Sequence, residues 1–502
     1  MLAFLGLLSR VLGVLRDRIL ASHFGASDLL DVYYVSFHVP DFIFNLLVVG
    51  AVAAAFIPVF IEYQSKNDGG EWEIANNFLN ILVTMMALTA GILFVFTPWL
   101  IRFIAPGFSP EKQYLAVLFT RVMLVSPIIF SVSVVIGSIL QIFNRFLAYA
   151  LAPIMYNLGI IFGAIVLVPK FGPLGLAEGV VLGALLHLAI QLPALKGIGF
   201  KWRKIWMWSD IGMKKILKLM IPRTMGIALI QINLIILDMF ASKISSGSVT
   251  MINFANNFQY LPISLVGISI AVASFPTLSR EALKEDKVDF SRRIDKTLCR
   301  ILFIAVPLSF LMVYLRADLI RVILGAGLFG SRDIELTGQI LGWFSVGVFA
   351  QSIIPFLARS FYAMQNTWVP VVASMAGVAA NIFFVLYFLP NMKIFALPLA
   401  FSIAGILNAV ILVVFLKRYL KLFPVSKIGI YFLKLIYICA IMTLAIFVAD
   451  LFISFNLNSL GSLYQIITLS LIGTITFIVF SYILKLEEVE IFKAWKGILW
   501  RT

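Results

Sequence analysis

The chain has 502 residues, of which 62% are hydrophobic and only 13% are charged, and its mean hydropathy is +1.03. Such a composition excludes a soluble globular protein. The formal net charge of +15 would suit a nucleic-acid partner, but the basic residues lie mainly in short segments between apolar runs, a distribution that membrane orientation explains. We therefore expect a membrane protein that binds no nucleic acid.

Apolar runs of about 18 to 30 residues recur along the whole chain, and each can cross a hydrocarbon core about 30 Å thick as a helix. We expect an all-α polytopic membrane protein with about 14 transmembrane helices. Its expected parts are an N-terminal six-helix lobe at 1–196, a basic cytoplasmic loop at 197–212, a C-terminal six-helix lobe at 213–421, two additional transmembrane helices at 422–484 and a cytoplasmic tail at 485–502.

The first apolar segment is interrupted by charge in the stretch SRVLGVLRDRILASHFG, residues 9–25, and we expect it to be retained as a helix. At 3.6 residues per turn, Arg10 and Asp17 share one face with two glycines, and Arg16 lies on its flank. A charge at the centre of a lone membrane helix costs roughly 2.5 to 3.5 kcal/mol. We therefore expect a hydrated cavity that receives an anion, since the arginine fork holds phosphate at two points. The alternatives are a structural ion pair or an interfacial amphipathic helix.

The second half contains a polar but mostly neutral region after Arg223. The amides of Asn256, Asn257 and Gln259 can bind sugar hydroxyls, or they can join helices by hydrogen bonds. Asp238 is an acid within an apolar stretch. It indicates either a cation or proton site or a structural pair with a residue such as Arg223.

Basic residues gather in alternate loops. Seven lie between Lys196 and Lys218 against one acid, Asp210, and the segment 280–300 is also basic, whereas residues 450–463 contain no Lys or Arg. By the positive-inside rule, the basic loops and both termini are expected on the cytoplasmic side.

An internal repeat returns after about 220 residues. Pro40 pairs with Pro262, Asn157 pairs with Asn381, and the offset stays between 218 and 224. Two similar halves are typical of secondary transporters, whose site lies between the repeats. Six helices per half is an even number, so the repeat is expected to be parallel. Chance similarity among leucine-rich segments is the alternative.

Few residues indicate enzyme chemistry. His23, His38 and His187 are scattered and are interpreted as structural or interfacial side chains, and the two cysteines lack metal-ligand spacing. The sequence GAGLFG at 325–330 follows an apolar helix and not a strand, so it does not indicate a dinucleotide site. We expect neither an enzyme nor a bound cofactor.

Several motifs together resemble one family, the MurJ (MviN) lipid II flippases of the multidrug/oligosaccharidyl-lipid/polysaccharide exporter superfamily. The resemblance covers nearly the whole chain and lies in SRVLGVLRD at 9–17, FGAS at 24–27, AFIPVFIEYQSK at 55–66, APGF at 105–108, LQIFNRF at 140–146, QLPALKGIG at 191–199 and FYAMQNTWVPV at 361–371. It implies two lobes around a central cavity in a bacterial cytoplasmic membrane. It also implies that alternating access moves undecaprenyl-pyrophosphate-linked peptidoglycan precursor from the inner to the outer leaflet, while the lipid tail follows a groove beside the last two helices.

The resemblance also implies a substrate site. Arg10, Arg16, Asp17 and Asp31 match charged positions of the family's first two helices, and Arg16 matches a cavity arginine important for flipping. We expect Arg16 and Arg10 to hold the pyrophosphate, and the three amides named above to bind sugar or peptide.

The chain departs from the family pattern at several cavity positions. Phe44, Asn45 and Val49 stand where many members have two arginines and a glutamate in the second helix, and Asn257 and Tyr260 stand where they have arginine and glutamate in the eighth. These departures question the usual arginine triad.

A cation site is a further implication of the resemblance. Asp238 resembles a sodium-site acid, and its expected partner Asn381 is not an acid. Sodium, protons or the membrane potential are the open sources of coupling.

The expected partners are lipid II, the bilayer and cell-wall synthesis proteins. A flippase for another lipid-linked oligosaccharide, of the capsule or O-antigen type, and a non-transporting scaffold relative are the alternative functions. A membrane glycosyltransferase is disfavoured, since the sequence has no D-x-D motif and no histidine cluster.

Overall fold

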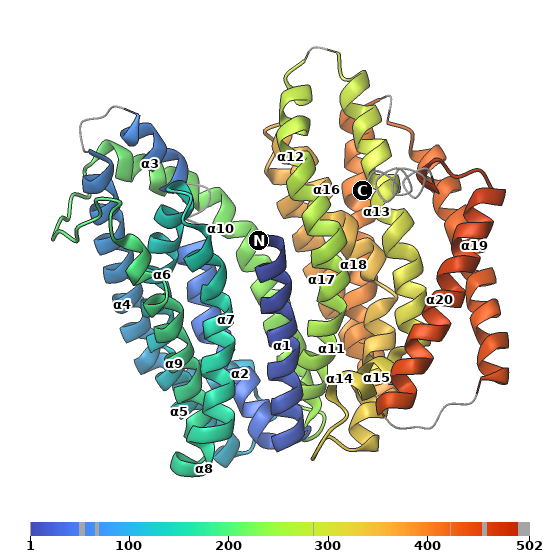
Figure 1. Cartoon of the computed structure of the whole chain (residues 1–502), viewed down its shortest axis with the longest axis horizontal. Helices are drawn as coiled ribbons and strands as arrows, with labels where there is room; N and C mark the ends of the chain where they lie inside the picture. Colours follow the sequence, from blue (N-terminus) through green and yellow to red (C-terminus); the bar gives the residue numbers. More distant parts are fainter. Residues whose placement is uncertain are drawn as a thin grey trace. The chain divides into compact units, whose positions relative to one another are not determined.

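The computed structural model describes residues 2–49, 56–65, 70–284, 286–421, 423–453 and 459–489. All regular structure in these residues is helical (Figure 1), which confirms the expected all-α class. Contacts between residues divide the chain into two units. Unit 1 comprises Met1–Thr250 with Ala326–Gly330, and unit 2 comprises Met251–Gly325 with Ser331–Thr502.

Unit 1 is built on pairs of packed helices. Its helices are α1 (Leu2–Phe24), α2 (Asp28–Phe44), α3 (Ile57–Gln64), α4 (Gly70–Ile104), α5 (Pro110–Met123), α6 (Val125–Ile142), α7 (Phe146–Phe162), α8 (Val168–Phe171), α9 (Gly175–Ala189), α10 (Ile211–Ala241) and the first turn of α11 (Ser248–Pro262). The charged helix α1 packs mainly on α7, and α2 packs on α5, α4 and α6. α7 in turn packs along α9.

Unit 2 holds the rest of α11 and the remaining helices. They are α12 (Ser269–Ala282), α13 (Val288–Tyr314), α14 (Arg316–Leu324), α15 (Ser331–Ser345), α16 (Val348–Ala363), α17 (Trp368–Met392), α18 (Ala396–Tyr419), α19 (Val425–Phe452) and α20 (Ser459–Ile483). Its apolar core joins α12, α13, α16 and α18 to α19 and α20, with fully buried phenylalanines such as Phe290, Phe356 and Phe423.

Eight helical runs in the described residues are long and apolar enough to span a membrane, or nine if the bent pair α15 and α16 is one span. Two of these runs, Phe146–Leu195 and Trp368–Tyr419, contain 50 and 52 residues, far more than the roughly 20 that one crossing needs. Each folds back on itself, because α7 packs on α9 and α17 packs on α18. About 14 crossings are compatible with these runs, and their exact number stays a prediction.

Glycines allow α7 and α9 to approach closely. A Cβ added to Gly159 would lie 2.2 Å from the Cα of Gly183, and one added to Gly163 would lie 2.5 Å from the Cα of Gly179. Both helices carry their glycines four residues apart, which places them on one face. Small residues with this spacing let helix backbones pack where lipid supplies no hydrophobic driving force.

The internal repeat has a counterpart in the helices. A π-helical turn at Asn45–Val49 follows Pro40, and another at Ile263–Ile268 follows Pro262. The two turns begin 218 residues apart, within the offset range of the sequence repeat. Contacts group α10 with unit 1, whereas the repeat places it in the second lobe, so the expected lobe boundaries stay a prediction.

Candidate functional site

The charges of the first helix meet an amide of α7 inside unit 1. Arg16 donates from Nε and Nη2 to Oδ1 of Asp17 at 3.0 and 2.8 Å, and from Nη1 to Oδ1 of Asn157 at 3.2 Å. Asp17 is 4% exposed and Asn157 is 7% exposed, whereas the Arg16 side chain keeps 22% of its surface. The guanidinium is therefore oriented by two buried acceptors, while part of the side chain stays accessible.

The face expected to hold Arg10 is open. Arg10 is half-buried, and no described atom lies within 4 Å of a Cβ built at Gly6 or Gly13. The two glycines thus leave space on the face of α1 that carries Arg10, and the binding of a ligand there stays a prediction. The described structure shows no close packing of a neighbouring backbone on either glycine.

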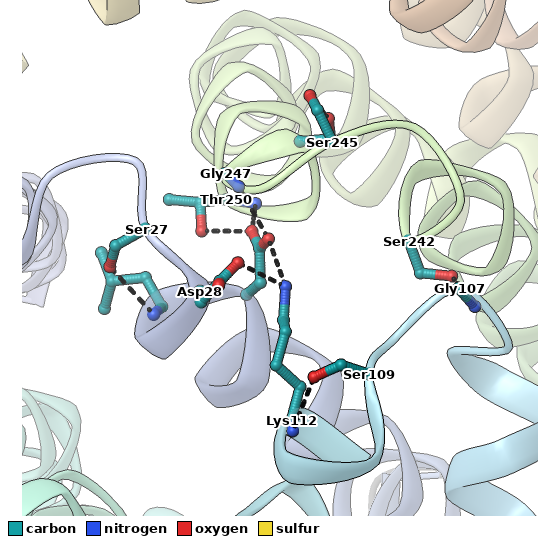
Figure 2. A network of polar contacts seen from close by, with 12 residues as sticks. Ser27, Asp28, Gly107, Ser109, Lys112, Ser242, Ser245, Gly247 and Thr250 are labelled. Carbon is teal, nitrogen blue, oxygen red and sulfur yellow. Dashed lines mark hydrogen bonds and ion pairs between the residues drawn. The ribbon is translucent and has the colours of Figure 1, made fainter.

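Asp31 lies in a network of polar contacts that joins α2 to the turn before α11 (Figure 2). Its Oδ1 accepts hydrogen bonds from the backbone N–H and the hydroxyl of Thr250 at 2.9 and 2.8 Å, and its Oδ2 accepts the N–H of Gly247 at 2.8 Å. Lys112 of α5 lies 3.4 Å from Asp31 Oδ2 and 2.6 Å from Asp28 Oδ1.

With 1% of its surface exposed, the Asp31 carboxylate holds these groups in place and offers little surface to a ligand. Its expected contact with substrate stays a prediction that this geometry does not support.

Asp238 of α10 pairs with a histidine of α2. Nε2 of His38 lies 2.7 Å from Oδ2 of Asp238, and both residues are buried. The structural partner considered for Asp238, Arg223, has a side chain outside the described residues. The observed partner is His38, which the sequence analysis interpreted only as a scattered structural or interfacial side chain.

The residues expected to bind sodium are assigned to different units. Asp238 belongs to unit 1, and Asn381, buried on α17, belongs to unit 2. Their oxygens are of the kind that suits a hard cation. However, His38 already occupies one Asp238 oxygen in this structure, so the residues present do not fit a sodium ion here. The sodium site stays a prediction.

The expected amides of the second half lie on α11 within unit 2. Gln259 is 1% exposed and donates from Nε2 to Oδ1 of Asn256 at 2.8 Å. Asn256 and Asn257 are half-buried. The structure therefore brings Asn256 and Gln259 together, a contact compatible with either expected role, sugar binding or helix joining.

Phe44 and Asn45, two of the positions that depart from the family pattern, have partners within unit 1. Phe44 packs on the ring of Phe130, with ring centres 5.3 Å apart, and Asn45 donates to the carbonyl of Asp41 at 2.8 Å. Tyr260 is 54% exposed, and the Val49 side chain lies outside the described residues.

Three partners were missed from the sequence: Asn157, His38 and Lys112. The internal repeat singles out Asn157, because it pairs this residue with Asn381. No local sequence pattern, however, indicates that Asn157 contacts Arg16. His38 and Asp238 are 200 residues apart, and only tertiary packing brings such side chains together.

Among the described residues, no three His, Cys, Asp or Glu side chains gather as a metal site would require. The cluster around Arg16 has the chemistry of an anion site, because a guanidinium held by a carboxylate and an amide presents fixed N–H donors.

Comparison with known proteins places the chain beside one family. A family model described as "Lipid II flippase MurJ" matches residues 20–468. A protein of Buchnera aphidicola named "Probable lipid II flippase MurJ" is 31% identical over 385 residues, which cover 75% of this chain and 74% of the relative. "Lipid II flippase MurJ" of Burkholderia cenocepacia is 27% identical over 424 residues, 82% of each chain.

Solved structures agree with these sequence matches. A structure titled "Lipid II flippase MurJ, inward closed conformation" superposes with a TM-score of 0.79 at 25% identity, covering 96% of this chain and 98% of that one. An inward-facing MATE family transporter of the MOP superfamily has a TM-score of 0.69 at 14% identity, covering 82% and 94%. The second likeness shows the shared fold alone.

Proposed function

From its membership of the lipid II flippase MurJ family, to which this chain belongs, we infer that it moves lipid II from the inner to the outer leaflet of a bacterial cytoplasmic membrane. The family model spans 449 of the 502 residues, from 20 to 468. The fold it shares with a MOP-superfamily transporter supports alternating access as the mechanism. Basic residues in alternate loops, with none at 450–463, support cytoplasmic termini.

The Arg16 cluster carries this proposal within the chain. A guanidinium has five N–H donors, and the contacts of Arg16 to Asp17 and Asn157 use three of them. Within the described residues, one N–H on each Nη is thereby left to donate to a ligand. Two donors on a planar fork match two oxygens of a phosphate.

In the proposed mechanism, Arg16 binds the pyrophosphate and Arg10 adds a second positive charge one to two turns away on the same helix. Asp17 orients Arg16 and offsets part of its charge, so that binding stays reversible. The amides Asn256, Asn257 and Gln259 contribute hydrogen bonds to the sugar or peptide part of the substrate. Asp31 contributes indirectly, by holding the turn between α10 and α11.

Complementation tests the transported substrate. The chain is expressed in a bacterium depleted of its own lipid II flippase, with membrane level measured by immunoblot. Growth and cell shape should be restored. Lysis despite a normal membrane level of folded protein would contradict lipid II as substrate.

A further inference from the structure

The segment that leads into α10 forms an exposed basic and aromatic surface. We define the ledge as residues 201–208, KWRKIWMW. Its tryptophans Trp202, Trp206 and Trp208 are 64%, 47% and 52% exposed, and its three basic side chains, Lys201, Arg203 and Lys204, are also exposed. Large aromatic side chains do not normally stand in water beside charges without a partner.

The backbone of the ledge is held by a row of buried asparagines on α4. Asn76 donates to the carbonyl of Lys201 at 3.0 Å and accepts from the N–H of Arg203 at 2.7 Å. Asn77 donates to the carbonyl of Met207 at 2.9 Å and accepts from its N–H at 2.7 Å. Each amide thus binds backbone through both its nitrogen and its oxygen.

A third asparagine completes the row. Asn80 donates to the carbonyls of Arg203 and Ile205 at 2.8 and 3.1 Å, and its oxygen accepts the indole N–H of Trp202 at 3.0 Å. Because α4 satisfies these backbone groups, the ledge is held in place with its charged side chains exposed. A surface ordered in advance loses less conformational entropy when a ligand binds.

No acidic side chain in the described part of the chain forms an ion pair with the basic side chains of the ledge. The nearest acid along the chain, Asp210, accepts the N–H of Met213 at 2.9 Å and caps the N-terminus of α10. Lys204 lies over the ring of Trp206, 5.3 Å from its centre, so the cation and the aromatic face are presented together.

We propose that the ledge binds the headgroups of anionic phospholipids in the leaflet beside it. Tryptophans favour the headgroup level of a bilayer, and neighbouring Lys and Arg side chains attract anionic lipid. The proposal rests on the asparagine row and the exposed cations of unit 1, and it holds whichever lipid-linked substrate the chain transports.

Native mass spectrometry of the full chain in detergent tests the ledge. Bound phosphatidylglycerol is compared with phosphatidylcholine of the same acyl chains, for wild type and for the triple variant Lys201→Gln/Arg203→Gln/Lys204→Gln. The matched control is Arg292→Gln/Lys296→Gln/Arg300→Gln, three exposed basic residues on α13.

We expect wild type to bind an excess of phosphatidylglycerol, and the ledge variant to lose that excess about fivefold or more, since each nearby basic side chain adds roughly that factor. The control should lose less of that excess than the ledge variant, because its charges lie outside the ledge and Arg292 lies 3.9 Å from Asp289. The proposal would be overturned if wild type bound no more phosphatidylglycerol than phosphatidylcholine, or if the ledge variant kept the wild-type excess. It would also be overturned if the control variant lost as much of that excess as the ledge variant.

A second variant tests the asparagine row without changing any charge. Asn76→Ala/Asn80→Ala releases the backbone of the ledge, and we expect an intermediate loss of phosphatidylglycerol. The single variant Asn77→Ala provides the same comparison if the double variant fails to fold. Binding equal to wild type in a folded variant would contradict the proposed preorganisation.

Discussion

Arg16 of α1 donates a 3.2 Å hydrogen bond to Asn157 of α7, across 141 positions of sequence. The contact gives the first helix a polar attachment within unit 1, in addition to the packing of α1 on α7. The Arg16 side chain also stays partly exposed, and the glycine face of the same helix is open. An arginine held in this way can bind an anion without first losing much side-chain freedom.

Replacing Asn157 by alanine should slow lipid II transport about three- to tenfold, because hydrogen bonds to charged groups contribute roughly 1.5 to 3 kcal/mol and Asp17 still holds Arg16. The measurement is the rate of lipid II appearance in the outer leaflet of complemented cells. Gln141→Ala, at an amide that donates to the carbonyl of Gly137 within α6, is the control. A full rate in Asn157→Ala would show that Arg16 needs no amide to orient it.

Replacing Asp31 by alanine should lower the free energy of unfolding by about 3 to 5 kcal/mol, because the ammonium of Lys112 and two backbone N–H groups lose a buried acceptor. Denaturant titration in detergent measures this change. Asp28→Asn is the control, since Asp28 is 57% exposed and an exposed pair contributes at most about 1 kcal/mol. Equal effects of the two substitutions would contradict a structural role for Asp31.

The contact between His38 and Asp238 predicts energetic coupling. A double-mutant cycle of His38→Gln and Asp238→Asn should give a coupling of roughly 1 to 3 kcal/mol, as found for buried side chains in direct contact. Unfolding in detergent provides the four free energies. Additive effects would show that the 2.7 Å contact contributes nothing to stability.

The same contact predicts the response to sodium. Because His38 occupies an oxygen of Asp238, exchanging potassium chloride for sodium chloride at equal concentration should leave the unfolding midpoint of wild type unchanged. Stabilisation by sodium alone, lost in Asp238→Asn, would establish the cation site that this geometry disfavours.

Close packing of α7 on α9 predicts sensitivity at its glycines. Gly159→Ala places a Cβ 2.2 Å from the Cα of Gly183, so the helices must separate at a cost of about 1 to 3 kcal/mol or more. Gly91→Ala is the control, because a Cβ there meets nothing described within 4 Å. Thermal unfolding in detergent compares the two. A tolerated Gly159→Ala would mean that α7 and α9 pack less tightly.

Much of the fold follows from local sequence. Apolar runs long enough to cross a bilayer predict helices, because backbone groups there cannot reach water. The repeat of Pro40 at Pro262 agrees with the two matching π-helical turns, but it does not by itself predict where those turns lie. The described helices therefore agree with the expected class, while the assignment of α10 to unit 1 depends on contacts that no local pattern contains.

The candidate site was less predictable than the fold, because its contacts join residues that lie far apart in the sequence. Helical periodicity placed Arg10, Arg16 and Asp17 on or beside one face of α1, and family resemblance supplied a role. Partners from other helices, such as His38 for Asp238 and Asn157 for Arg16, are set by tertiary packing and leave no short-range signal. The asparagine row of α4 is a further example, since its partners lie more than 120 residues away.

The most direct test of the account measures lipid II in the outer leaflet of cells that depend on this chain, with wild type beside Arg16→Ala and Arg16→Lys at equal membrane levels. We expect wild type to export lipid II, Arg16→Ala to lose at least about a hundredfold in rate, and Arg16→Lys to recover only part of it, because lysine keeps the charge but not the fork. Normal export by folded Arg16→Ala would contradict the central claim that this guanidinium binds the pyrophosphate during transport.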